Sequence, residues 1–298
     1  MTARSAYPVL FLGVAAVSFA AIFIRLAFAA LPERGLAESV LIASGRLLVA
    51  SVLVLPLALP ARPLARDRRA VGLAALAGVF LALHFLFWIA SLAYTSIAAS
   101  TTIVTTNPVW IALVEALFFK KKIAPATWFG IGLAVLGGAV IGLADAGGAA
   151  AGTAPLFGDL LALLGAWAVS LYFLLGREAQ RVLGTTGYVG VAYPAAALFL
   201  LPLPWLLGEG YLGHPAPFYL WVFLLAAVPQ MLGHTSLNYA VRFLGPTIVT
   251  LFVLFEPVIA SLAGYFFFGE LPPAGVFAGA LVLLIGVALA VRVSVGKA

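Results

Sequence analysis

The chain has 298 residues, of which 64% are hydrophobic and 9% charged, and its formal net charge is +6. This composition excludes an ordinary soluble domain, whose water-exposed surface needs far more charged residues. The absence of cysteine also excludes disulfides and thiolate metal sites.

Apolar stretches long enough to cross a bilayer, at about 20 residues each, follow one another along the whole chain. They cover residues 8–30, 38–59, 71–93, 97–119, 126–144, 157–177, 187–207, 217–240, 246–268 and 275–293. Runs of this length are typical of membrane helices, whereas the strands of a barrel would be about half as long and alternate in polarity. The sequence therefore predicts an all-α integral membrane protein with ten transmembrane helices.

The basic residues outside these stretches fall on alternate loops. With the N-terminus in the cytoplasm, the inner side holds Arg4, Arg62, Arg66, Arg68, Arg69, Lys120, Lys121, Lys122, Arg177, Arg181, Arg242, Arg292 and Lys297. The opposite loops keep only Arg34. The positive-inside rule thus predicts that both termini are cytoplasmic. The net positive charge then reflects anchoring at a lipid bilayer, and we expect no nucleic-acid partner.

Three sequence matches in the same order indicate an internal duplication. The segment N-P-V-W-I-A-L-V-E-A-L-F-F-K around Pro108 resembles E-P-V-I-A-S-L-A-G-Y-F-F-F-G around Pro257. Upstream, G-V-A-A-V-S-F-A-A-I-F-I-R from Gly13 matches G-A-W-A-V-S-L-Y-F-L-L-G-R from Gly165. Between them, S-L-A-Y at Ser91 matches S-L-N-Y at Ser236. A duplicated membrane domain is typical of carriers.

The duplication divides the chain into a first repeat over residues 1–146, a linker over 147–156 and a second repeat over 157–298. Five helices per repeat is an odd number, so the second repeat must be inverted relative to the first. Two inverted repeats can expose one central cavity alternately to each side of the membrane. The linker is rich in Gly and Ala, which suits a flexible join.

Polar side chains are costly in hydrocarbon, so the polar face of a membrane helix is expected to point toward the protein interior and away from lipid. The expected third helix has such a face, formed by His84, Trp88, Ser91 and Thr95. Its counterpart, the eighth, has one formed by Gln230, His234 and Asn238. Two interpretations remain open: these groups line a substrate cavity, or they bond neighbouring helices together.

The fourth and ninth helices each contain a proline near the middle. Pro108 cannot donate a hydrogen bond to the carbonyl of Val104, and Pro257 leaves that of Val253 free in the same way. Asn107 stands directly before Pro108. The two bends are candidates for gating, and the alternative is that they only shape the packing.

Glu256 is the one carboxylate that the sequence places deep within a span. A carboxyl group buried there can take up a proton near neutral pH, which makes it a candidate proton site. In the alternative, Glu256 is permanently neutral and bonds to the broken helix. Arg46, about a third of the way into the second helix, requires a water-filled cavity or an acidic partner.

Aromatic residues in the expected spans suggest one wall of the cavity. Trp88, Trp110 and Trp167 lie away from the ends of their spans, and Ser170 shares the sixth helix with Trp167. Aromatic faces with scattered neutral hydrogen-bonding groups suit a small amphipathic solute. A phosphorylated substrate would need several inward Arg or Lys residues, so it is disfavoured.

Several motifs resemble the drug/metabolite transporter superfamily, EamA type. They are the two five-helix copies, W-A-V-S-L-Y-F-L-L-G-R early in the second copy, L-F-E-P-V-I-A-S-L-A-G-Y-F-F-F-G-E-L ending at Leu271, and the Gly-spaced last helix. Within it the chain looks like the YddG-type exporters of aromatic and other amino acids. The resemblance implies ten helices around a central cavity in a bacterial inner membrane. The first copy departs from the pattern, with N-P-V for E-P-V and K-K-K for G-E.

We therefore expect a secondary transporter that works by alternating access and exports small amphipathic metabolites. The expected metabolites are amino acids, including aromatic ones. The residues expected at the substrate are His84, Trp88, Asn107, Trp110, Trp167, Ser170, Gln230, His234 and Asn238. We expect no catalytic residue, metal or cofactor. The sequence does not reveal the oligomeric state, and a monomer is kept as the hypothesis. The alternatives are a multidrug or other metabolite exporter, an intramembrane hydrolase and a purely structural scaffold.

Overall fold

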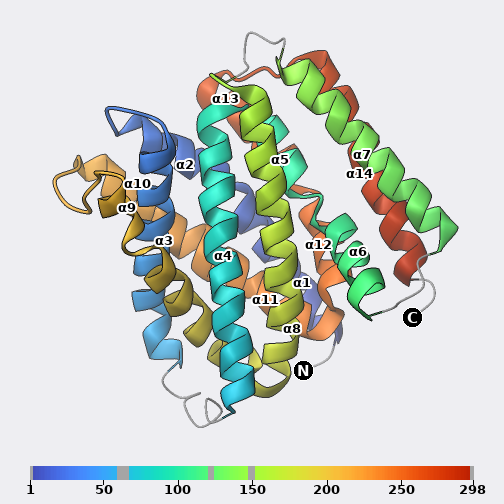
Figure 1. The fold of residues 1–298 in the computed structure, drawn as a ribbon, viewed down its shortest axis with the longest axis horizontal. Coiled ribbons are helices and arrows are strands. Elements are labelled where there is room, and N and C mark those ends of the chain that lie inside the picture. Colours follow the sequence, from blue (N-terminus) through green and yellow to red (C-terminus); the bar gives the residue numbers. More distant parts are fainter. Residues whose placement is uncertain (1–2, 59–66, 120–123, 147–151, 296–298) are drawn as a thin grey trace.

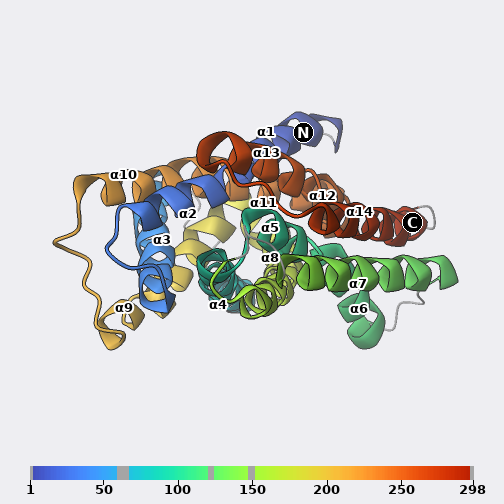
Figure 2. The ribbon, with the colours of Figure 1, turned by 90° about the horizontal axis from the view of Figure 1, so that it is seen from above.

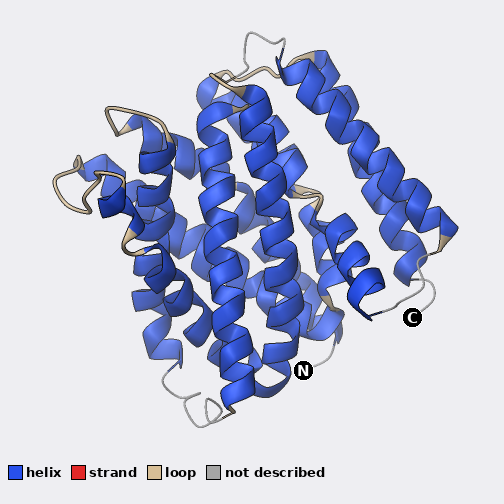
Figure 3. Cartoon of the chain, in the orientation of Figure 1, coloured by secondary structure: helices blue, strands red, loops and turns tan. Residues whose placement is uncertain are grey.

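The computed structural model describes residues 3–58, 67–119, 124–146 and 152–295, apart from some side chains within these ranges. In these ranges the secondary structure is helical and contains no strand (Figure 3). The first half comprises α1 (Ala3–Ser18), α2 (Ala20–Ala29), α3 (Leu36–Ala58), α4 (Arg68–Tyr94), α5 (Ile97–Val104), α6 (Asn107–Phe119) and α7 (Pro125–Ala146). The second comprises α8 (Pro155–Leu200), α9 (Leu203–Leu206), α10 (Ala216–Leu225), the π-helix η2 (Ala226–His234), α11 (Thr235–Leu244), α12 (Pro246–Val253), α13 (Glu256–Phe268) and α14 (Ala274–Val295).

The helices group into the predicted membrane crossings. Six helical stretches of the described residues are long and apolar enough to cross a membrane, and three shorter apolar ones accompany them. One of the six, Pro155–Leu206, has 52 residues, more than twice the length that a single crossing needs. Its helix α8 turns at Gly184, whose φ of 65° is readily adopted only by glycine. The fold is therefore an all-α membrane protein of about ten helices, as the hydropathy predicted.

Several crossings are broken helices. The first consists of α1 and α2, which meet at Phe19, and the fourth consists of α5 and α6, separated by Thr105 and Thr106. In the ninth, α12 and α13 are separated by Leu254 and Phe255. The fourth and ninth breaks lie directly upstream of Asn107-Pro108 and Glu256-Pro257, where the prolines predicted bends.

The helices form a compact group from which α7 and α14 project together (Figures 1 and 2). These two helices pack along each other, and α4 packs along α8 in the same way near the middle of the molecule. Both pairs approach closely at glycines. A β-carbon at Gly78 of α4 would meet the carbonyl oxygen of Ala192 and lie 2.9 Å from the β-carbon of Ala195. Small residues allow this approach, which supplies packing energy that the hydrophobic effect cannot provide within lipid.

Replacing Gly78 with Ala is expected to lower the melting temperature of the purified protein by several degrees. The added methyl group meets backbone atoms, so α4 and α8 must separate, and overpacking of this kind costs about 1–3 kcal/mol. Gly72 on the same helix has no atom within 4 Å of a β-carbon position, which makes Gly72→Ala the matched control. Equal melting temperatures for the two variants would contradict the close contact.

Candidate functional site

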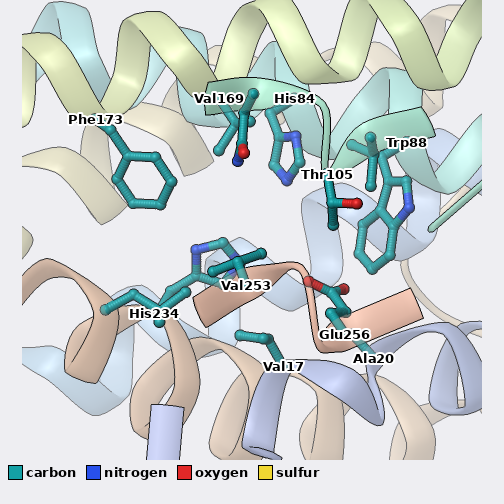
Figure 4. Close-up of a pocket in the computed structure, with 13 residues that line it drawn as sticks. Val17, Ala20, His84, Trp88, Thr105, Val169, Phe173, His234, Val253 and Glu256 are labelled. Atoms are coloured by element: carbon teal, nitrogen blue, oxygen red, sulfur yellow. The ribbon is translucent and has the colours of Figure 1, made fainter. Parts of the chain in front are cut away.

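A cavity lies in the middle of the molecule, where broken helices from both halves meet (Figure 4). It offers about 30 Å³ of space for water centres, enough for one or two water molecules but too little for a metabolite. The cavity is therefore too narrow to hold a substrate in this conformation. Its lining consists of Val17, Ala20, His84, Trp88, Val104, Thr105, Asn107, Val169, Phe173, His234, Leu237, Val253 and Glu256.

Irregular backbone surrounds the cavity on several sides. Thr105 lies in the break between α5 and α6, and Glu256 begins α13 directly after the break in the ninth crossing. Val17 and Ala20 flank the junction of α1 and α2, and His234 ends the π-helix η2. Non-helical backbone at membrane depth is tolerated where it is buried in protein or lines a cavity, because its polar groups need partners there.

Two histidines and a tryptophan form the aromatic side of the cavity. The His84 ring stacks on Trp88 with centroids 5.9 Å apart and planes 6° apart. Nδ1 of His84 lies 3.0 Å from the carbonyl oxygen of Gly165, which fixes the ring. His234 faces His84 at 6.2 Å between centroids. Nε1 of Trp88 and Nδ1 of His234 are buried without a hydrogen-bond partner, so both can serve a ligand or a water molecule.

Glu256 and Asn107 bring oxygen atoms to the cavity from the two proline-marked breaks. Figure 4 shows the Glu256 carboxylate near Thr105 and Trp88. Glu256 is only 7% exposed. The side-chain oxygen of Asn107 lacks a partner, while its main-chain carbonyl accepts a bond of 3.2 Å from Ser170.

The structure brings five of the sequence-predicted polar or aromatic residues to one cavity: His84, Trp88, Asn107, His234 and Glu256. Three others are buried around it but do not line it. Ser170 bonds within α8 to the carbonyl of Ala166, Asn238 donates to the Tyr172 hydroxyl at 2.5 Å, and Gln230 accepts from Arg46. Pro108 and Pro257 follow the two helix breaks, as their sequence positions predicted.

The expected aromatic wall is different from the one that the structure shows. Trp110 and Trp167 lie outside the cavity, paired edge to face with centroids 5.2 Å apart. Trp167 is 42% exposed on the outer surface of α8, and Trp110 borders a separate apolar hollow between α6, α7 and α8. Hydropathy does not determine the rotation of a membrane helix, because an indole is tolerated both in the interior and toward lipid. Phe173 occupies the cavity side of α8 instead.

Sequence reasoning missed several cavity residues because they are small or apolar. Val17 and Ala20 are ordinary membrane-helix residues by type, and only the break beside them distinguishes their position. Thr105 belongs to the run S-T-T-I-V-T-T-N-P, which begins at Ser100. Its position shortly before Pro108 was the sequence signal that could have identified it as a cavity residue.

Polar contacts join three elements at the end of the molecule where α5 begins and α13 ends (Figure 1). Arg25 of α2 donates to the carbonyl of Thr95 at 2.8 Å and lies 3.8 Å from the Glu270 carboxylate. Glu270 in turn accepts from the Ile97 amide at 2.8 Å, a favourable position for an anion at a helix N-terminus. We call Arg25, Thr95, Ile97 and Glu270 the end latch. It ties α2, α5 and the end of α13 together.

Two stretches of the chain, residues 4–143 and 156–292, match the EamA-like transporter family. Over 257 residues the chain is 28% identical to a probable terminal-alkyne amino-acid exporter of Streptantibioticus cattleyicolor, covering 85% of this chain and 84% of that protein. It is 25% identical to the uncharacterized transporter YdfC of Bacillus subtilis over 192 residues. That match covers 64% of this chain and 61% of the relative, so the chain spans less than two thirds of that relative's length.

A solved crystal structure shares the fold. It superposes with a TM-score of 0.64 at 22% sequence identity, covering 97% of both chains. At this identity the likeness concerns the fold alone.

Proposed function

Because the chain belongs to the EamA-like transporter family, a family of membrane transporters, we propose that it exports small amphipathic metabolites, amino acids including aromatic ones, by alternating access. The observation that carries this proposal is the central cavity between the two proline-marked helix breaks. Its wall combines stacked aromatic rings with unpartnered polar atoms. Such a wall suits a solute with both an apolar body and polar groups.

We propose that the transport unit consists of two inverted repeats, residues 1–146 and 157–298, joined by a linker over 147–156. The first family match ends at residue 143 and the second begins at residue 156, which supports this division. The equivalent positions of the breaks before Pro108 and Pro257 support it as well. Residues 147–151 of the linker lie outside the described part of the chain.

We also propose an inner-membrane location with cytoplasmic termini. Helix α1 begins and α14 ends at the same end of the molecule, away from the end latch (Figure 1). The orientation follows from the basic residues, of which Arg62, Arg66, Lys120, Lys121, Lys122 and Lys297 lie outside the described residues. In this orientation the end latch lies on the outer side, and we propose that it holds the cavity closed to the outside.

Reconstituted flux tests the function. Purified protein in liposomes is expected to take up radiolabelled phenylalanine and leucine saturably, with each competing against the other. Empty liposomes supply the control. A multidrug or other metabolite exporter of the same family would instead show saturable flux of other solutes and indifference to both amino acids.

An intramembrane hydrolase is not favoured by the site. Such an enzyme needs a nucleophile within hydrogen-bond reach of a base. His84 bonds to a backbone carbonyl and stacks on Trp88. Within the described residues, neither His84 nor His234 makes a hydrogen bond to a Ser or Thr hydroxyl.

Replacing Glu270 with Gln is expected to open the outer side more often. The amide keeps an acceptor for the Ile97 N–H but loses the attraction to Arg25, which is worth roughly 1 kcal/mol for a partly buried pair. A loss of that size shifts the equilibrium about five-fold. The chain has no cysteine, so Thr105→Cys places a single thiol at the cavity, and its labelling in intact cells by a membrane-impermeant maleimide measures the shift.

The matched control for this experiment is Glu33→Gln, which removes an exposed carboxylate between α2 and α3. It should leave the labelling rate of the introduced thiol as it is in the Thr105→Cys variant alone. Equal labelling in the Glu270→Gln and Glu33→Gln backgrounds would show that the end latch does not hold the outer side closed.

A further inference from the structure

Arg46 is a fully buried cation whose hydrogen-bonding groups are largely unused. Its side chain is 0% exposed in the middle of the helix bundle. Nε donates to Oε1 of Gln230 at 3.1 Å, but Nη1 and Nη2 have no partner. No Asp or Glu among the described residues lies within 4.0 Å of it. A guanidinium without a carboxylate in direct contact is costly in this environment, so its free donors suit a partner that enters with another molecule or in another conformation.

The unused atoms of Arg46 and Gln230 are all donors. Because arginine has no acceptor, its bond to Gln230 fixes the amide with the oxygen toward Arg46. The Nε2 of Gln230 is then a donor as well, and it too is buried without a partner. Three nitrogen atoms therefore present N–H groups with no acceptor. A carboxylate offers two oxygens and several lone pairs, which meets this requirement.

The backbone at Gln230 is specialised. Gln230 lies in the π-helix η2, which contains Pro229 and whose wider turns are frequent at functional sites. The Tyr193 hydroxyl lies 3.4 Å from the carbonyl oxygen of Gln230 and 3.0 Å from the Thr235 hydroxyl. These contacts hold Gln230 in position beside Arg46 on a helix that ends at the cavity with His234.

Arg46 lies one aromatic ring behind the cavity wall. Its guanidinium stacks on the Phe85 ring at 3.8 Å, and Phe85 meets the cavity residue His234 edge to face at 5.1 Å. Any transported solute requires the cavity to enlarge from its present volume. A swing of His234 or Phe85 would then connect the cavity to the free Nη atoms. On the cavity wall itself, Glu256 provides a carboxyl group.

We infer that Arg46 and Gln230 form a subsite for the carboxylate of the substrate, with Glu256 facing its ammonium group. This inference rests on the proposed transport function and names the chemical class within it: a zwitterion, bound through both of its charges. An amine without a carboxylate lacks the group that Arg46 needs.

Binding of matched ligands to the full chain in nanodiscs tests the subsite. Phenylalanine and leucine are compared with phenylalaninamide and leucinamide, which differ only at the carboxylate, by isothermal titration. We expect the wild type to bind the acids roughly 10- to 100-fold more tightly than the amides, the range for charge-assisted hydrogen bonds. Arg46→Gln should bring this ratio close to one.

Two further variants keep the test decisive. Gln230→Glu supplies an internal carboxylate to Arg46, so it should fold at least as well as the wild type and still lose the preference for acids. It decides the matter if Arg46→Gln does not fold. Glu256→Gln should weaken acids and amides alike and leave their ratio unchanged. A higher ratio in Glu256→Gln would instead assign Glu256 as the partner of Arg46 and overturn the inference.

The inference and the proposed function can fail separately. A ratio near one in the wild type, an unchanged ratio in Gln230→Glu, or no binding of any of the four ligands overturns the carboxylate subsite. Saturable flux in liposomes with a ratio near one leaves the transporter proposal in place. An acid preference that depends on Arg46, without any flux, supports the subsite and removes the transport proposal.

Discussion

Phenylalanine in place of Ala20 is expected to abolish transport while leaving the protein folded. Ala20 begins α2 beside the break at Phe19, lines the central cavity and is only 1% exposed. A benzyl group there fills the roughly 30 Å³ that the cavity offers and more, so no solute can share the site. Overpacking costs about 1–3 kcal/mol, which lowers the melting temperature without unfolding the chain.

The measurement is the initial rate of amino-acid uptake into liposomes, with the melting temperature recorded for each variant. We expect a loss of at least 100-fold, equal to ~2.7 kcal/mol in the barrier. Ala29→Phe adds the same group at an exposed position near the other end of α2 and should transport at the wild-type rate. A folded Ala20→Phe variant with wild-type flux would show that the solute does not pass through this cavity.

The architecture could be predicted from the sequence because the bilayer imposes it. Crossing lengths follow from hydrocarbon thickness, and the predicted crossing at 97–119 corresponds to α5 and α6 together. Proline lacks an N–H, so Pro108 and Pro257 marked the two breaks correctly. These features depend on local chemistry that each residue carries with it.

Side-chain direction could be predicted only where polarity is strong. His84 and His234 are costly toward lipid, and both face the cavity. Trp110 and Trp167 carry no such penalty, and their positions depend on helix rotation, which packing between distant segments determines. The wider turns of η2 were not predicted either, although Pro229 within them is a local signal of irregular backbone.

Arg46 lies between these two cases. Its sequence position predicted a water-filled cavity or an acidic partner, and no Asp or Glu among the described residues lies within 4.0 Å of it. It provides Gln230 and the Phe85 ring instead. A buried cation with two free Nη groups and no carboxylate in contact costs stability, which favours a role in binding.

Replacing Pro257 with Ala is expected to slow transport about tenfold while the melting temperature stays level or rises. In the structure α12 ends at Val253 and α13 begins at Glu256, so Pro257 lies in the first turn of α13, where its missing N–H has no cost. Alanine restores a donor for the Val253 carbonyl and favours one continuous helix. A continuous helix moves Glu256 off the cavity wall and removes the joint on which gating is proposed to depend.

The opposite signs of the two effects make this experiment informative. A merely structural proline would change stability and turnover together, whereas a hinge should gain stability and lose about tenfold in rate, ~1.4 kcal/mol in the barrier. Pro56→Ala, at an exposed position within α3, is the matched control and should transport normally. Pro108→Ala should behave like Pro257→Ala if the two breaks act as equivalent joints. Wild-type turnover in both variants would leave the breaks with a role in packing only.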